Sequence, residues 1–175
     1  MRNIFWGLIL VFIDFNITME GGSIGLLPDF IGYALIASGL SCMAEEGIRF
    51  VKARPFAMFM IFYTGIIYVL DFAGMLGNMG AAGVVIEAVA LAVSFYIEYE
   101  IVKGVMDMED RYRKRFGGQG LFAIWKVAVV AAVASYVCLL IPEVALSMII
   151  ASLIVNILFL VQFNTAKSLY EAEGC

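Results

Sequence analysis

Six apolar segments alternate with polar ones along the chain. Because about 20 apolar residues in a helix cross about 30 Å of hydrocarbon, segments of this kind are typical of transmembrane helices. The pattern predicts six helices, over residues 3–17, 28–43, 56–76, 81–97, 121–140 and 144–163. The long polar stretch at residues 98–120 is expected to be a cytoplasmic linker whose first part extends the fourth helix. We therefore predict an all-α integral membrane protein with six transmembrane helices in a single membrane domain, residues 1–175.

Prolines and glycines mark the expected helix ends. Gly21 and Gly22 indicate a turn at residues 18–27. Pro28 and Pro55 suit the first turn of a helix, because a helix makes no use of the N–H at that position. We expect these prolines to open the second and third helices.

Short motifs recur along the chain and predict three copies of one helical hairpin. Residues 11–15 (VFIDF) resemble residues 68–72 (YVLDF). Residues 25–29 (GLLPD) have a counterpart in residues 83–87 (GVVIE), and residues 139–143 (LLIPE) carry part of the same motif. Each copy would begin on the same side of the membrane, so the predicted repeat is parallel, about an axis along the membrane normal.

Basic residues all fall toward one side of the six-helix arrangement. Ten of the eleven lie in segments of that side: Arg2, Arg49, Lys52, Arg54, Lys103, Arg111, Arg113, Lys114, Arg115 and Lys167. The last, Lys126, lies near the same end of the fifth helix, where its stem can reach the headgroups. Since basic residues in short loops stay in the cytoplasm, both termini are predicted to be cytoplasmic.

Composition supports the membrane and argues against several kinds of chemistry. Hydrophobic residues make up 63% of the chain and charged residues 15%, against about 45–50% and about 25% in soluble domains. The chain has no histidine, and its three cysteines are far apart and form no CxxC pair, so neither a metal site nor a disulfide framework is indicated. We find no nucleophile–base pair and no sign of nucleic acid binding. The sequence predicts no cofactor and a protein that is not an enzyme.

Two stretches, Phe5-Trp6-Gly7-Leu8 and residues 26–33 (LLPDFIGY), carry a resemblance to a known group. The chain resembles small uncharacterised multi-pass membrane proteins of clostridia-like bacteria. The resemblance implies a place in the bacterial inner (plasma) membrane and implies no activity.

Four carboxylates are the candidate site residues. Asp14, Asp29, Asp71 and Glu87 lie toward the outer ends of the first four predicted helices, where no basic residue is expected. A carboxylate near the bilayer centre costs about 2.5–3.5 kcal/mol and usually faces the interior of a helix bundle. They favour an outward-facing acidic cavity that binds or passes a proton or a small cation, with Glu87 inside the hairpin and within reach of Asp71. The alternative is that these acids stabilise helix ends, by about 0.3–1 kcal/mol each, or lie in the wet headgroup region.

Two further features favour a second class of function, a non-catalytic membrane scaffold or accessory subunit. Small residues four apart in the last two helices, such as Ala128 and Ala132 or Ser147 and Ala151, let helices approach closely in lipid. The basic end of the linker, residues 111–115, could contact anionic lipid or a cytoplasmic partner, or simply be a positively charged loop. The expected partners are the lipid bilayer and either a membrane-protein partner or a second copy of the chain.

Overall fold

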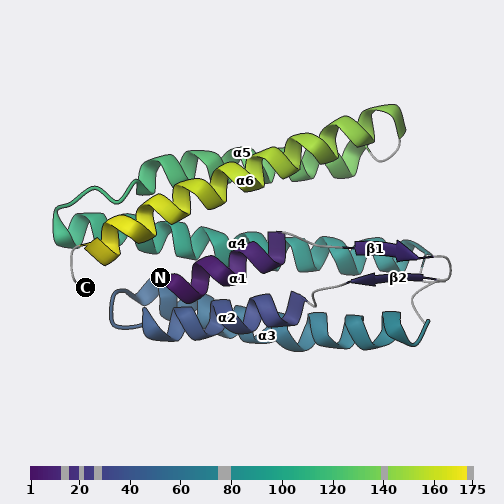
Figure 1. The fold of residues 1–175 in the computed structure, drawn as a ribbon, viewed down its shortest axis with the longest axis horizontal. Coiled ribbons are helices and arrows are strands. Elements are labelled where there is room, and N and C mark those ends of the chain that lie inside the picture. The colour runs from purple at the N-terminus through teal and green to yellow at the C-terminus, as the bar shows by residue number, and fades with distance from the viewer. Residues whose placement is uncertain (13–15, 20–21, 26–28, 75–79, 139–141, 173–175) are drawn as a thin grey trace. The chain divides into compact units, whose positions relative to one another are not determined.

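A computed structural model describes residues 1–12, 16–19, 22–25, 29–74, 80–138 and 142–172 of the chain. These residues form six helices and one β-hairpin (Figure 1). In chain order the elements are α1 (Arg2–Phe12), β1 (Asn16–Met19), β2 (Gly22–Gly25), α2 (Asp29–Cys42), α3 (Ile48–Phe72), α4 (Gly80–Tyr112), α5 (Gly118–Cys138) and α6 (Pro142–Ala172). The chain divides into two compact units, residues 1–100 and residues 101–175, and the boundary falls inside α4.

Three of the described helices are long and apolar enough to cross a membrane. The segments are Ile48–Leu70 in α3, Gly118–Ser135 in α5 and Ile150–Ala172 in α6. Their outer faces carry large apolar side chains; Phe62 is 72% exposed and Val130 is 68% exposed. An exposed apolar surface of this extent suits lipid and not water. The described residues are therefore consistent with a helical membrane protein with three candidate spans, and they do not support the predicted six transmembrane helices. For α1, with 11 residues, and α2, with 14 residues, the helix alone is shorter than the roughly 20 residues that a span needs.

The connection between α1 and α2 differs from the predicted helix and turn. The first helix was expected to continue to residue 17, but Asn16–Met19 is strand β1, which pairs antiparallel with β2. Ile17 lies opposite Ile24, and Thr18 lies opposite Ser23. Isoleucine and threonine are β-branched and favour strands over helices, so the local sequence supports the hairpin.

Helices α3 and α6 are longer than the sequence pattern predicts, because their apolar faces continue into segments that contain polar residues. Helix α3 begins at Ile48 and contains Pro55 in its interior, whereas Pro55 was expected to open it. Buried Phe50, Ala53 and Ala57 lie three or four residues apart, so one face packs continuously past the proline. In the same way Phe159, Phe163, Ala166 and Tyr170 are buried along α6, which ends at Ala172 and not at residue 163. Helix α4 continues to Tyr112, which confirms the predicted extension of the fourth helix into the linker 98–120.

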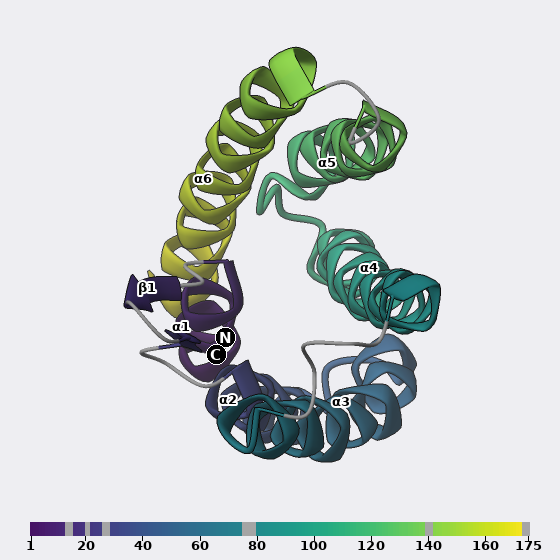
Figure 2. The same ribbon diagram turned by 90° about the vertical axis from the view of Figure 1, so that its right-hand side faces the viewer.

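In the first unit, α1 packs against α2 through glycines, and α2 packs against α3 (Figure 2). A Cβ added to Gly39 of α2 would lie 2.5 Å from Cγ1 and 2.7 Å from the backbone nitrogen of Ile4 in α1. A Cβ added to Gly7 would lie 2.6 Å from the backbone oxygen of Gly32. The two helices therefore approach so closely that only glycine fits at these contacts, which is the small-residue packing seen between helices in membranes.

Helices α3 and α4 run antiparallel and meet through side chains at three levels. Arg49 and Glu100 form an ion pair of 3.4 Å. Further along, the rings of Phe56 and Tyr96 meet edge to face with centroids 4.6 Å apart. The hydroxyl of Tyr63 then donates a hydrogen bond of 3.1 Å to the backbone oxygen of Ile86.

In the second unit, α5 packs against α6, and a carboxylate closes the turn between α4 and α5. Glu109, in the last turn of α4, accepts hydrogen bonds at Oε1 from the backbone N–H groups of Phe116, Gly117 and Gly118, at 2.6, 2.7 and 3.1 Å. The first N–H groups of a helix have no partner within the helix, so Glu109 caps α5. Gly117 has φ +87°, a backbone conformation that residues with a Cβ rarely adopt. Glycine adopts it without strain and so permits the turn.

Candidate functional site

The four carboxylates predicted to form the site lie in different surroundings. Asp14 lies outside the described residues. Asp71 is in the last turn of α3, and its side chain lies outside the described part. Asp29 is half-buried in the first turn of α2, the position at which a helix dipole stabilises an acid. Glu87 is exposed on α4, which does not fit the expected position inside the hairpin.

A groove on the first unit lies between the start of α2 and the second half of α3 and is apolar. Its volume is about 610 Å³, and its lining is Phe30, Ile61, Phe62, Gly65, Ile66, Tyr68, Val69 and Leu70. No carboxylate is among these residues. This groove therefore gives no support to an acidic cavity.

The structure draws attention instead to two glutamates on α4 that are both buried. Glu98 and Glu100 are each 5% exposed, although they point to nearly opposite sides of the helix, which turns about 100° per residue. The carboxylate of Glu100 is paired with Arg49 of α3. For Glu98, no hydrogen-bond or ion-pair partner is found among the residues that the structure describes.

Burial without a partner changes the acidity of Glu98. Glu98 lies just beyond the predicted apolar span at residues 81–97. Desolvation disfavours the charged form of a carboxyl, and burial raises the pKa of Glu98 from 4.5 to about 8. At neutral pH the protonated, uncharged acid is therefore the main form, and the group can exchange a proton within the physiological range of pH.

Polar groups of α2 and α4 accompany this carboxyl. The hydroxyl of Tyr33 in α2 donates a hydrogen bond of 3.0 Å to Oγ of Ser94 in α4. Ser94 lies four residues before Glu98 and so on the same face of α4. Tyr33 is also near enough to Glu98 for the two to interact electrostatically. We refer to Tyr33, Ser94 and Glu98 as the Glu98 cluster.

Sequence reasoning missed the Glu98 cluster because Glu98 was assigned to the polar linker. Two signals could have found it. Apolar residues continue past residue 97 at helical spacing, at Ile101, Val105 and Met108, all of which are buried. Two acids that are two residues apart in such a helix also point to different sides, so at least one of them needs a buried environment or a partner.

No protein-family model matches the chain, and searches of curated proteins and of solved structures also find no match. Among the described residues there is no group of three or more cysteine, aspartate or glutamate side chains that could hold a metal ion.

Proposed function

We propose that this chain is a multi-pass protein of the bacterial plasma membrane that binds a proton at the carboxyl of Glu98. The observation that carries the proposal is a glutamate that is 5% exposed and has no partner among the described residues, beside a second buried glutamate that is paired with Arg49. A buried acid with a strongly perturbed pKa is a frequent mark of a functional group. The Tyr33–Ser94 hydrogen bond beside it supplies hydroxyl groups that can donate to the ionised carboxylate when the proton leaves.

The proposal includes six membrane crossings with both termini in the cytoplasm. The apolar segments of α3, α5 and α6 have the required length, and the one-sided distribution of basic residues supports the orientation. In the first hairpin, α1 has 11 residues and α2 has 14, so these helices reach roughly 17 and 21 Å at about 1.5 Å per residue. They would cross where the bilayer is locally thinned, and the β-hairpin would lie outside the hydrocarbon on the outer side, because unpaired strand edges are not tolerated in lipid. Glu98 would then lie just beyond the cytoplasmic end of the fourth crossing, residues 81–97.

Infrared difference spectroscopy tests the protonation of Glu98 directly. The full chain in lipid vesicles would be taken from about pH 6 to about pH 9, a range that brackets the raised pKa. We expect the absorption of a protonated carboxyl to disappear in the wild-type protein and to be missing at both pH values in Glu98→Gln. Glu100→Gln is the matched control, because it removes the paired glutamate, and it should keep the signal. The same signal in Glu98→Gln would refute proton binding at this residue.

Whether the bound proton also crosses the membrane is a separate measurement. The flux can be measured in proteoliposomes that contain a pH-sensitive dye. If Glu98 passes protons across the membrane, the wild type should show a proton flux and Glu98→Gln should abolish it. If Asp71 and Glu87 form the outer part of the proton path, their alanine variants should show a reduced flux. An unchanged flux in Glu98→Gln would contradict a role in passage.

The alternative, a non-catalytic scaffold or accessory subunit, is favoured by the exposure of Glu87 on α4 and of Ser147 and Ala151 on α6. These two small residues leave a surface of α6 on which another helix could pack closely. Under this alternative, large side chains at Ser147 and Ala151 would remove a membrane-protein partner or a second copy in a crosslinking experiment and would leave proton binding unchanged.

A further inference from the structure

Helix α5 contains one charged residue, and that residue lies within an apolar segment. Lys126 is the only acidic or basic residue between Gly118 and Cys138. It lies eight residues after the start of the candidate membrane span Gly118–Ser135. A charge within such a span is costly unless it has a partner or reaches the headgroups. Among the described residues Lys126 forms no ion pair.

An aromatic ring holds Lys126 close to a second lysine. Nζ of Lys126 lies 5.0 Å from the centroid of the Phe122 ring, and Nζ of Lys103 in α4 lies 4.2 Å from the same centroid. Each contact has cation–π geometry. Both ammonium groups therefore lie within 5.0 Å of one ring centroid, and two like charges this near each other attract an anion.

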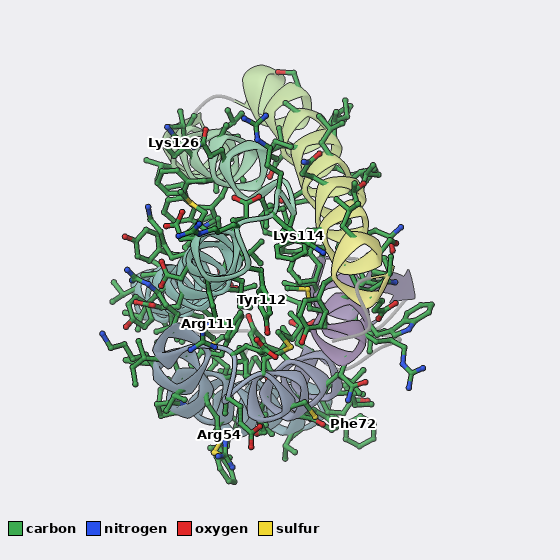
Figure 3. The ribbon with its side chains drawn as sticks, turned by 90° about the vertical axis from the view of Figure 1, so that its left-hand side faces the viewer. Arg54, Phe72, Arg111, Tyr112, Lys114 and Lys126 are labelled. Atoms are coloured by element: carbon green, nitrogen blue, oxygen red, sulfur yellow. The ribbon has the colours of Figure 1, made fainter. Side chains whose placement is uncertain are left out.

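The surroundings of this lysine pair are those of a membrane interface. The ring of Trp125 stacks on that of Phe122 with centroids 5.8 Å apart and planes 8° apart. Tryptophan and other aromatic residues gather at the depth of the lipid headgroups. Lys126 is exposed, and Lys103, Phe122 and Trp125 are half-buried (Figure 3 shows Lys126 on α5). Glu100, three residues before Lys103, is paired with Arg49. Asp107, four residues after Lys103, carries one negative charge against the two lysines, so the group keeps a net positive charge.

We propose that Lys103 and Lys126, with Phe122 between them, bind the headgroup phosphate of an anionic phospholipid. The proposal rests on the membrane location proposed above and does not depend on proton binding at Glu98. Charge complementarity identifies an anion, and the position of Lys126 within an apolar span identifies a lipid as its source. The acyl chains of the lipid would lie along the exposed apolar side chains of α5, such as Val127 and Val130.

Quenching of Trp125 by brominated lipids tests the proposal. The chain has two tryptophans, so a Trp6→Phe background leaves Trp125 as the single reporter, next to Lys126. The full chain would be placed in phosphatidylcholine vesicles with increasing brominated phosphatidylglycerol or brominated phosphatidylcholine. We expect phosphatidylglycerol to be preferred at Trp125, and we expect Lys126→Gln and Lys103→Gln each to reduce that preference by about fivefold. Lys126→Arg, which keeps the charge, should retain it.

The control is Lys114→Gln, which removes the same charge from an exposed lysine in the α4–α5 turn (labelled in Figure 3) and should leave the preference unchanged. Equal quenching by the two lipids would overturn the proposal. An equal loss in Lys114→Gln would also overturn it, because general surface charge would then explain the effect. Loss of the preference on adding excess inorganic phosphate would identify a free anion as the ligand and refute the lipid. If Lys126→Gln does not fold, the wild-type preference and its loss in Lys103→Gln decide the question.

Discussion

Replacing Glu98 by glutamine should make the protein more stable at neutral pH and leave its stability unchanged in acid. Glutamine has the shape of the protonated acid and carries no charge at any pH. In the folded wild-type chain, burial raises the pKa of Glu98 to about 8, whereas the unfolded chain has the usual value of 4.5. Below pH 4.5 the carboxyl is protonated in both states, so it then contributes no difference between the wild type and the variant.

The size of the effect follows from these two pKa values. Between pH 4.5 and pH 8 the unfolded chain has released the proton while the folded chain still holds it. The free energy of unfolding of the wild type therefore falls by about 1.4 kcal/mol for each unit of pH in this window. Relative to acid, the loss is about 3 kcal/mol at pH 7 and about 5 kcal/mol above pH 8. Glu98→Gln does not undergo this loss. The difference in the free energy of unfolding between the variant and the wild type should therefore grow as the pH rises from 4.5 to 8.

Denaturant titrations in neutral detergent at a series of pH values measure this difference, with helix content as the signal. The other titratable groups are the same in the wild type and the variant. Their effects on the free energy of unfolding therefore cancel when one curve is subtracted from the other. Glu100→Gln serves as a control: it leaves Arg49 without its buried partner and should destabilise the chain at neutral pH. Parallel curves for the wild type and Glu98→Gln from about pH 4 to about pH 9 would refute the assignment of a buried, proton-binding carboxyl.

Three other changes have defined outcomes. Glu109→Ala should lower the free energy of unfolding by about 2 kcal/mol, because three backbone N–H groups lose their acceptor, and Glu109→Gln, which keeps an oxygen acceptor, should lose less; equal losses would contradict the cap. Gly39→Ala should cost about 1–3 kcal/mol, because its Cβ would lie 2.7 Å from the backbone of Ile4, whereas Gly47→Ala, whose nearest contact is 3.8 Å, should cost little; similar thermal stability of the two variants would argue against the close α1–α2 contact. In intact cells a membrane-impermeant thiol reagent should label a cysteine placed at Gly22 and should not label Cys42, which is exposed in the protein; labelling of Cys42 would reverse the proposed orientation.

The apolar segments predicted the existence and approximate position of all six described helices, because long apolar runs in this chain have few other possible structures. The helix ends were predicted less well. Pro55 looked like a helix start, yet α3 begins seven residues before it, at Ile48, since the packing of Phe50 and Ala53 outweighs the one backbone hydrogen bond that proline removes. The strand at Asn16–Met19 was missed because Ile17 was taken as the end of the apolar run of the first helix, although polar Asn16 and Thr18 alternate with apolar Ile17 and Met19.

The four predicted site acids and the Glu98 cluster differ in the property that identifies them. Acids were selected for lying within apolar runs, which identified Glu87, and Glu87 is exposed. Glu98 lies in a stretch of mixed polarity, and its burial depends on which faces of α4 are covered, which a single sequence does not contain. Local sequence also does not show that Arg49 pairs with Glu100 and leaves Glu98 without such a partner, because the partner comes from another helix.

The close contact between Gly7 of α1 and Gly32 of α2 has a consequence for how the protein is made. Both helices and the strands that join them are complete by Cys42, so the contact needs no later part of the chain. The pair can therefore assemble as soon as it leaves the ribosome and the insertion machinery, before α3 has been synthesised. In the proposed membrane protein, helix α3 would then enter the bilayer beside a preformed surface. A substitution at either glycine would remove that surface at the earliest stage, and its main effect in the cell would be a lower yield of inserted protein, even where the finished molecule tolerates the change.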